Sequence, residues 1–182
     1  MAAKQTFWLI PGRQSATASP GCFVNAACNL IAKILTPSDF APYGEVFVAP
    51  REGRENTDWE IPSFDRAKFC ISLSRRAPAA LPFSTQIMER HRQSQQIFIP
   101  LRISRFLVIV APNDGAPTPR LERAVAFIGR EGQALNYRAG TWHHPFTVLD
   151  REAEYASLMF RDGGPLDEEF VDLPRPLLIT SE

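Results

Sequence analysis

The stretch Gly140-Thr141-Trp142-His143-His144-Pro145, together with Glu89-Arg90-His91 about fifty residues earlier, decides our interpretation of the chain. All three histidines of the protein lie in these two stretches. Glu89 and His91 are two residues apart, so on a strand their side chains point to the same face. Imidazole transfers protons near neutral pH and is the commonest metal ligand. We therefore expect the two stretches to meet in one site on the inner wall of a small β-barrel.

Short alternating runs broken by proline and glycine continue on both sides of these stretches. Sixteen prolines and thirteen phenylalanines indicate many turns and an aromatic core. About nine short strands predict a mainly β protein, a single antiparallel barrel with one or two short helices. One helix start is expected at Thr36-Pro37-Ser38-Asp39, which supplies an N-cap hydroxyl, a proline at the first helical position and an acid. Pro42 and Gly44 would end this helix.

With 182 residues, the chain is expected to form one domain. Residues 1–30 are predicted to be a flexible N-terminal extension, because Pro11 to Gly21 is rich in Ser, Ala, Gly and Pro. The absence of acidic residues before Asp39 leaves a weak organelle-targeting segment as the alternative. The barrel domain is expected over residues 31–172, and residues 173–182 are expected to form a C-terminal tail.

Composition argues against several classes of protein. Twenty basic and twenty acidic residues cancel, without the positive surplus of a nucleic-acid binder. No apolar run approaches the roughly 18 residues of a membrane span. The three cysteines, Cys22, Cys28 and Cys70, are odd in number and form no CxxC pair, so neither a disulfide framework nor a structural zinc site is predicted. A reducing compartment such as the cytoplasm is expected.

The spacing of the candidate ligands is that of a cupin barrel, in which two ligands two residues apart on one strand are followed by a third, and by a fourth on a later strand. Glu89 and His91 fill the first pair, Gln96 the third position, and His143 after the Gly140 turn the fourth. Such a set predicts either a divalent metal site or metal-free catalysis with Glu89 or a histidine as general base.

Several segments, in conserved order and spacing from about residue 31 to residue 172, resemble the signature segments of the ureidoglycolate lyase family. They are Phe40-Ala41-Pro42-Tyr43-Gly44-Glu45-Val46, Ile71-Ser72-Leu73-Ser74-Arg75, Met88-Glu89-Arg90-His91, Gln96-x-Phe98-Ile99-Pro100 and Asn136-Tyr137-x-x-Gly140-x-Trp142-His143-His144-Pro145. The resemblance implies a cupin-like, usually dimeric barrel that splits ureidoglycolate into glyoxylate and urea in purine-derived allantoin breakdown. It also implies a divalent metal such as nickel in some members, and no organic cofactor.

The resemblance also implies roles for individual residues. Glu89, His91 and His143 are the candidate catalytic residues, and His91, Gln96 and His143 the candidate metal ligands. The substrate carboxylate needs a cation, for which Arg75 is preferred because Arg90 alternates away from Glu89. The remaining candidates for substrate binding are Asn136, Tyr137 and His144.

The chain departs from the family pattern at Arg92 and Ser94, where Pro and Gly are usual, and at Ser74, where Asn is common. A relative of ureidoglycolate is therefore an alternative substrate. Two other interpretations stay open: another cupin-type enzyme acting on a small hydroxy acid, and a non-catalytic barrel that binds a small carboxylate. A sensor of that kind would usually carry an output module, and no pattern for one is visible.

Overall fold

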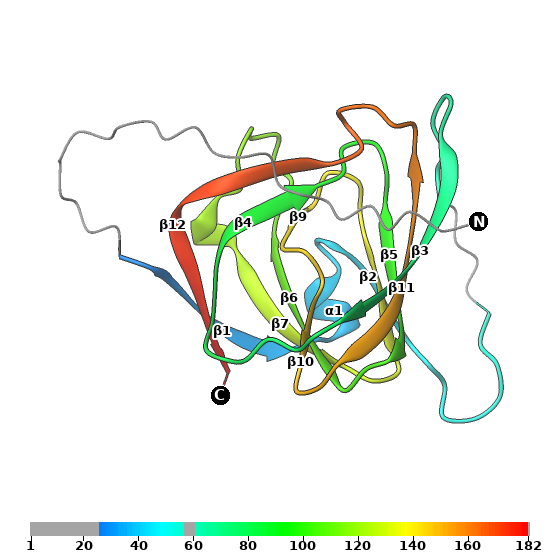
Figure 1. Ribbon diagram of the computed structural model, residues 1–182, viewed down its shortest axis with the longest axis horizontal. Coiled ribbons are helices and arrows are strands. Elements are labelled where there is room, and N and C mark those ends of the chain that lie inside the picture. Colours follow the sequence, from blue (N-terminus) through cyan, green and yellow to red (C-terminus); the bar gives the residue numbers. More distant parts are fainter. Residues whose placement is uncertain (1–25, 57–60, 182) are drawn as a thin grey trace, which may run out of the picture.

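The computed structural model describes residues 26–56 and 61–181 (Figure 1). Its strands are β1 (Cys28–Ile34), β2 (Gly44–Val48), β3 (Lys68–Arg76), β4 (Phe83–Arg90), β5 (Gln96–Arg102), β6 (Arg105–Ala111), β7 (Val125–Arg130), β8 (Gln133–Tyr137), β9 (Trp142–His143), β10 (Thr147–Leu149), β11 (Ala153–Arg161) and β12 (Glu169–Ser181). Within the described residues there is one short α-helix, α1 (Pro37–Phe40), and one 3-10 turn, η1 (Leu121–Arg123). The predicted mainly β architecture with few short helices is confirmed.

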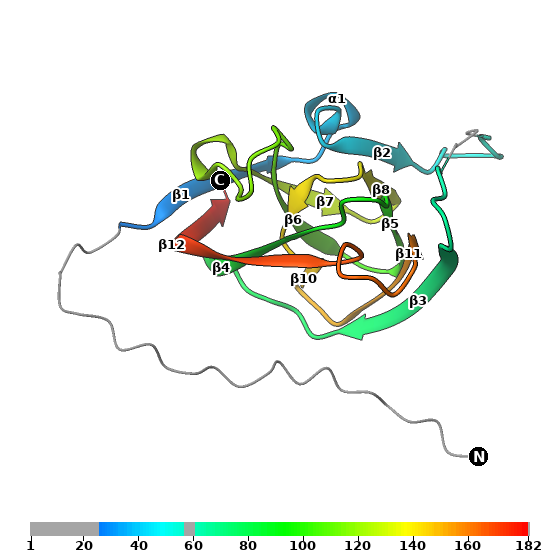
Figure 2. The same cartoon turned by 90° about the horizontal axis from the view of Figure 1, so that it is seen from above.

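The strands form two sheets (Figure 2). In the larger sheet the order is β10-β6-β7-β1-β12-β4-β9, and β9 also pairs with β6, so β6, β7, β1, β12, β4 and β9 close into a six-stranded barrel. The second sheet has the order β2-β8-β5-β11-β3 and stands beside one wall of this barrel. Pairing is antiparallel except at β1, which runs parallel to both β12 and β7.

Two apolar cores follow from this arrangement. One fills the closed barrel, and the other, rich in aromatic side chains, fills the space between the barrel and the five-stranded sheet. Strand β6 contributes to both, with Phe106 and Val108 in the aromatic core and Leu107 and Ile109 in the barrel core. A strand buried on both faces needs a continuous apolar sequence, which explains the uninterrupted run in β6. The expected aromatic core is confirmed.

The predicted helix start is also confirmed. Thr36 caps α1, because its Oγ1 accepts a hydrogen bond from the Asp39 amide at 3.2 Å, and Pro37 occupies the first turn. Phe40 closes the helix and is fully buried against Tyr43, Phe127 and Tyr137. This anchoring fixes α1 beside the aromatic core.

The boundaries of the folded part differ from those expected. Strand β1 begins at Cys28, three residues before the expected start at Ile31. The expected C-terminal tail, residues 173–182, lies almost wholly in β12, which runs to Ser181 between β1 and β4. Leu177 and Ile179 are fully buried in the barrel core. The predicted extension falls mostly on residues 1–25, outside the described residues. In the described segments, no helix is long and apolar enough to cross a membrane.

Candidate active site

Strands β4 and β9 bring the two histidine-bearing stretches together. Glu89 pairs in register with His143, and the Glu89 carboxylate oxygen Oε1 lies 3.3 Å from His143 Nε2. One ligand atom each from Glu89, His91 and His143 can be chosen so that all three lie within 4.8 Å of one another. All three side chains are buried. The convergence that the spacing predicted is therefore present.

Gln96 completes the cluster from the opposite side. It begins β5 in the five-stranded sheet, and its Oε1 lies 3.0 Å from His143 Nε2. Its amide nitrogen is 3.8 Å from the sulfur of Met159 on β11. The site therefore lies between the closed barrel and the five-stranded sheet. We had expected it inside the barrel, which is instead filled by apolar side chains.

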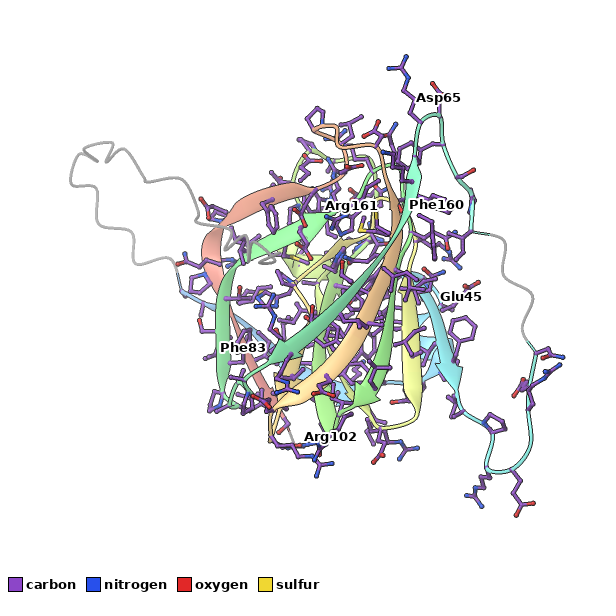
Figure 3. The ribbon with its side chains drawn as sticks, turned by 45° about the vertical axis from the view of Figure 1, so that its right-hand side comes forward. Glu45, Asp65, Phe83, Arg102, Phe160 and Arg161 are labelled. Atoms are coloured by element: carbon purple, nitrogen blue, oxygen red, sulfur yellow. The ribbon has the colours of Figure 1, made fainter. Side chains whose placement is uncertain are left out.

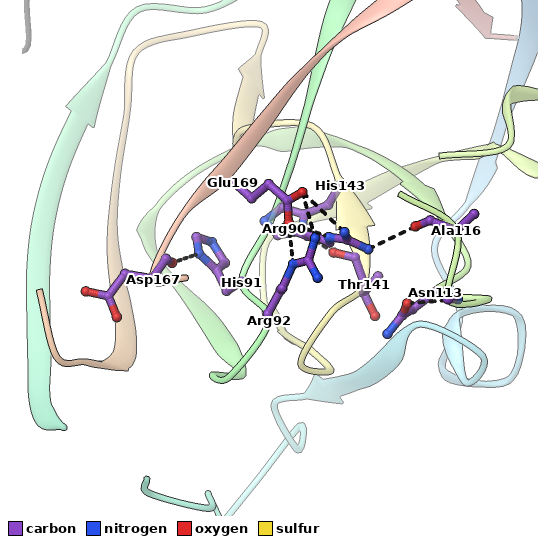
Figure 4. Close-up of polar contacts among 10 residues, drawn as sticks. Arg90, His91, Arg92, Asn113, Ala116, Thr141, His143, Asp167 and Glu169 are labelled. Carbon is purple, nitrogen blue, oxygen red and sulfur yellow. Dashed lines mark hydrogen bonds and ion pairs between the residues drawn. The ribbon is translucent and has the colours of Figure 1, made fainter. Parts of the chain in front are cut away.

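Main-chain carbonyls orient both imidazoles (Figure 4). His91 Nδ1 lies 2.6 Å from the carbonyl oxygen of Asp167, and His143 Nδ1 lies 2.8 Å from that of Thr141. A carbonyl only accepts hydrogen bonds, so each Nδ1 carries a proton and donates. His143 Nε2 then faces the Glu89 carboxylate at 3.3 Å, and His91 Nε2 has no partner among the described residues.

Two buried polar atoms at the site have no hydrogen-bond partner among the described residues. They are His91 Nε2 and the Tyr137 hydroxyl. His143 Nε2, in contrast, faces two oxygens, those of Glu89 and Gln96. Buried polar atoms are almost always paired in folded proteins. The arrangement is therefore suited to receive a further group, which a metal ion, water or a substrate would supply.

Electrostatics sets the charge state of the cluster. Burial alone would raise the pKa of Glu89, but the hydrogen bond and charge of His143 outweigh it and the pKa is lowered. Burial, with the charge of His143, lowers the pKa of His91. Near neutral pH, Glu89 is therefore a carboxylate and His91 a neutral imidazole. Both are in the form that accepts a proton or binds a cation.

Tyr137 is the one predicted substrate-binding residue that contacts this cluster directly. Its ring stacks on His143, with centroids 4.2 Å apart and planes inclined by 13°. Burial, and then the Glu89 carboxylate, raise the pKa of Tyr137, so the phenol keeps its proton. Its hydroxyl is thus a buried hydrogen-bond donor beside the site.

Asn136 and His144 point elsewhere. Asn136 faces away from Tyr137 on β8, and its amide donates to Gln95 Oε1 at 2.6 Å. His144 follows His143, faces away from it and packs edge-on against Phe83, with centroids 5.2 Å apart. Burial lowers the pKa of His144 to about 4, so it is neutral at physiological pH. His144 lies beside the site, whereas Asn136 lies on the opposite face of the sheet.

Arg75 does not reach the site of its own chain. It is the last residue but one of β3 and lies on the outer face of the five-stranded sheet, where it forms ion pairs with Glu154 and Glu152. Its side chain is 66% exposed. Arg75 pairs in register with Glu154 of β11. Glu154 is five residues before Met159, the β11 residue that contacts Gln96, so Arg75 is also displaced from the site along the strand. The preference for Arg75 as the carboxylate-binding cation is therefore wrong within one chain.

Arg90 faces away from Glu89, as predicted. Its guanidinium donates to both carboxylate oxygens of Glu169, at 2.8 and 3.2 Å (Figure 4). It also lies 4.1 Å above the Trp142 ring. Arg92, one of the departures from the family pattern, binds the same carboxylate at 2.6 and 3.0 Å. Ser94, another departure, accepts a hydrogen bond from the Phe160 amide at 2.9 Å. Arg92 and Ser94 therefore tie the loop after β4 to β12 and β11.

Arg161, the last residue of β11, lies near the site and was not among the predicted site residues. It lies two residues beyond Met159 and so shares its inward face, whereas Phe160 projects to the other side of the strand (Figure 3). The Nε of Arg161 is 3.0 Å from the Met159 sulfur. The alternation Met159-x-Arg161 is the sequence signal that identifies it.

Taken together, fold and site define a small β-barrel protein with a buried carboxylate–imidazole cluster, the kind of site that binds a metal ion or a small polar molecule. The sequence model of one family, described as ureidoglycolate lyase, matches residues 27–175. The chain belongs to the ureidoglycolate lyase family.

Individual relatives agree with this assignment. The chain is 37% identical over 116 residues to the ureidoglycolate lyase of Azotobacter vinelandii, a match covering 63% of this chain and 68% of that protein. It is 32% identical over 161 residues to the ureidoglycolate lyase of Chelativorans sp., covering 80% and 93%. Among solved structures, a dTDP sugar isomerase from Desulfovibrio desulfuricans G20 aligns with a TM-score of 0.45 and 17% identity, over 73% of this chain and 87% of that one.

Proposed function

We propose that this protein is a carbon–nitrogen lyase that cleaves ureidoglycolate to glyoxylate and urea, in the breakdown of allantoin from purines. The observation that carries the proposal is the buried cluster of Glu89, His91 and His143 in a chain of this family. The cluster combines an ionised carboxylate, a neutral imidazole and a hydrogen-bonded imidazole–carboxylate pair, which is a suitable set for moving protons.

The reaction requires two proton movements at one carbon atom. Ureidoglycolate carries a hydroxyl, a carboxylate and a ureido nitrogen on the same carbon. The hydroxyl loses its proton, its C–O bond becomes the carbonyl of glyoxylate, and the C–N bond breaks with its electron pair moving to nitrogen. A proton on that nitrogen completes urea. We assign Glu89 as the acceptor of the hydroxyl proton and the Nε2–H of His143 as the donor to nitrogen, with the unprotonated Nε2 of His91 accepting a hydrogen bond from the hydroxyl. The proton on Glu89 then passes to His143 Nε2, 3.3 Å away, and restores both groups.

The same side chains fit a divalent metal ion such as nickel. A main-chain carbonyl holds Nδ1 of each imidazole, and His143 Nε2 faces both the Glu89 carboxylate and the Gln96 amide oxygen. His91 Nε2 is buried without a partner among the described residues, and the three ionisable side chains converge. When bound, such an ion would supply a Lewis acid that favours loss of the hydroxyl proton. After equilibration with Ni²⁺ and dialysis, we expect about one ion per wild-type chain and a marked loss in His91→Ala; equal metal contents would contradict this assignment.

Product analysis tests the proposed function. Purified protein is incubated with racemic ureidoglycolate while glyoxylate, urea and ammonia are measured separately, and a blank without protein corrects for spontaneous breakdown. We expect glyoxylate and urea in equal amounts and no ammonia above the blank. Ammonia in place of urea would identify an amidohydrolase. No product above the blank would favour a non-catalytic carboxylate-binding barrel.

We also propose that the protein is a homodimer formed through the outer face of the five-stranded sheet. Large apolar side chains are exposed along β3 and β5 of that sheet: Phe69, Ile71, Leu73, Ile99 and Leu101. Contiguous exposed apolar patches of this kind commonly mark protein interfaces.

We expect a dimer by light scattering and a monomer for Leu73→Glu. Ile34→Glu, which alters an equally exposed apolar residue on β1, should remain dimeric. A monomeric wild type would contradict the proposal.

A cytoplasmic location is proposed on the cysteine content. Three cysteines without a CxxC pair suit a reducing compartment. Cys28 and Cys70, the two within the described residues, are both free thiols. Cell fractionation with an antibody to the protein tests this location, and recovery in an oxidising compartment or an organelle would contradict it.

A further inference from the structure

The structure leaves the substrate carboxylate without the cation that the sequence suggested. Arg75 lies on the outer face of the sheet, 66% exposed and paired with glutamates. Arg90 and Arg92 both bind the carboxylate of Glu169, so their guanidinium groups are already engaged with an anion. A cation for a small carboxylate substrate must therefore come from another element.

Arg161 lies at the edge of the site. Its Nε is 3.0 Å from the Met159 sulfur, which is 3.8 Å from the Gln96 amide nitrogen. The other end of that amide, Oε1, is 3.0 Å from His143 Nε2. A continuous line of contacts therefore leads from Arg161 to the centre of the site through two intervening side chains.

Long-range electrostatics agrees with this placement. After burial and His143, the positive charge of Arg161 is among the influences that lower the pKa of His91. Glu168, whose carboxylate lies 3.8 Å from Arg161, has a pKa raised first by burial and then by Glu89. Arg161 and Glu168 are thus both close enough to the cluster to interact with its charges. They form a polar pair at its solvent-exposed side.

The guanidinium of Arg161 is only loosely engaged. Its side chain is 38% exposed, and its ion pair with Glu168 is long compared with the 2.8 Å contact of Arg90. The planar guanidinium group binds carboxylates through two parallel hydrogen bonds. A partly exposed arginine without a tight carboxylate partner is suited to receive a carboxylate from a substrate.

We propose that Arg161 binds the carboxylate of the substrate and so selects small α-hydroxy carboxylates carrying a ureido group. Ser94 holds the preceding residue through the Phe160 amide and thereby positions the end of β11. The inference rests on the proposed function for the identity of the substrate, but the carboxylate contact itself can be measured without turnover.

The test compares Arg161→Gln and Arg161→Lys with Arg102→Gln, a control that removes an exposed arginine at the end of β5 in the same sheet. Glyoxylate is the probe, and its dissociation constant is measured by calorimetry. We expect binding about 10- to 100-fold weaker in Arg161→Gln, a smaller loss in Arg161→Lys, which keeps the charge but not the bidentate geometry, and a change under about twofold in the control. The KM for ureidoglycolate should rise in the same order.

The outcomes distinguish failure of the Arg161 carboxylate contact from failure of the proposed lyase function. Glyoxylate binding within about twofold of wild type in a folded Arg161→Gln protein would overturn the role of Arg161, as would failure of the wild type to bind glyoxylate. If Arg161→Gln does not fold, Arg161→Lys decides, and unchanged binding there overturns the role. Wild-type protein that binds glyoxylate through Arg161 but releases no urea from ureidoglycolate would overturn the proposed function while supporting the carboxylate site.

Discussion

Buried polar side chains lie on both faces of the end of β4, which includes His91 directly after the strand. The two faces differ in how completely these side chains are paired. Glu89, Arg90 and His91 are 6%, 4% and 2% exposed. Arg90 is fully engaged by Glu169, Ala116 and the Trp142 ring. On the other face, His91 Nε2 has no partner among the described residues, and Glu89 shares one nitrogen of His143 with Gln96.

This difference in pairing distinguishes polar side chains that stabilise the fold from those that are available for function. Burying a polar or charged group costs free energy unless it is paired, so the Arg90 face can be understood as a stabilising network. The Glu89–His91 face retains unpaired polar atoms that stability does not require. Such atoms are understood most simply as contacts for a bound ion or substrate. Substitutions on the two faces should therefore have different consequences.

The largest effect is expected for His91→Ala. Its product formation from ureidoglycolate should fall by about 100- to 10,000-fold, the usual contribution of a general acid–base group. The fold should persist, because the main-chain pairing of β4 is unaffected. Steady-state kinetics and circular dichroism check both parts. A variant that keeps more than about a tenth of the wild-type kcat/KM would remove His91 from the mechanism.

On the other face, Arg90→Leu should lower the free energy of unfolding by about 3 kcal/mol, because it breaks a buried ion pair. Glu169 keeps Arg92, which places the loss at the low end of the usual range. The matched variant Arg92→Leu removes the more exposed arm of the same bridge and should cost under about 1 kcal/mol. Urea denaturation measures both, and equal losses would contradict the distinction between the two arginines.

A smaller effect is expected at acid pH from Glu169. Its hydrogen bonds to Arg92 and Arg90 lower its folded-state pKa to about 2, from an unfolded value of 4.5. Its contribution is present above about pH 4.5 and is lost as the pH falls toward 2. Glu169→Gln should therefore be less stable than wild type at neutral pH and show a flatter loss of stability over this window.

His144 provides an internal control for that experiment. Burial lowers its folded-state pKa to about 4, below an unfolded value of 6.5. The unfolded state then binds more protons, so stability is lost as the pH falls from about 6.5 to 4. This part of the profile should be the same in Glu169→Gln and wild type. A change confined to it would assign the acid sensitivity to the histidine region instead.

Local periodicity was sufficient to predict much of the site. The two-residue period of a strand placed Glu89 and His91 on one face and Arg90 on the other, and both placements are observed. The helix start at Thr36 followed equally from local capping chemistry. These features depend on residues that are close together in the chain, which is where sequence patterns are most informative.

Features set by distant pairing could not be predicted in the same way. The closed barrel depends on parallel pairing of β1 with β12, from opposite ends of the described chain. In β12, Pro174 and Pro176 interrupt the apolar alternation where the pairing with β4 shifts register, so the strand resembled a tail. Because β12 was not recognised as a strand, the closed barrel and the position of the site beside it could not be predicted.

Arg75 illustrates the remaining ambiguity. Alternation places Phe69, Ile71 and Leu73 on one face of β3, and Arg75 belongs to that face. Which face points inward is set by the register with β11, where Cys70 stands opposite the inward-facing Met159. The apolar face is therefore the outer one, and it carries Arg75 away from the site. A single sequence contains no information on that register.

The most direct test of the account is Glu89→Gln, which removes one charge from the cluster and preserves the shape of the side chain. We predict that kcat/KM for ureidoglycolate falls at least about 100-fold, while the melting temperature stays within a few degrees of wild type. The result would separate catalysis from packing at one buried position. Wild-type activity in a folded Glu89→Gln protein would contradict the claim that this buried cluster is the active site.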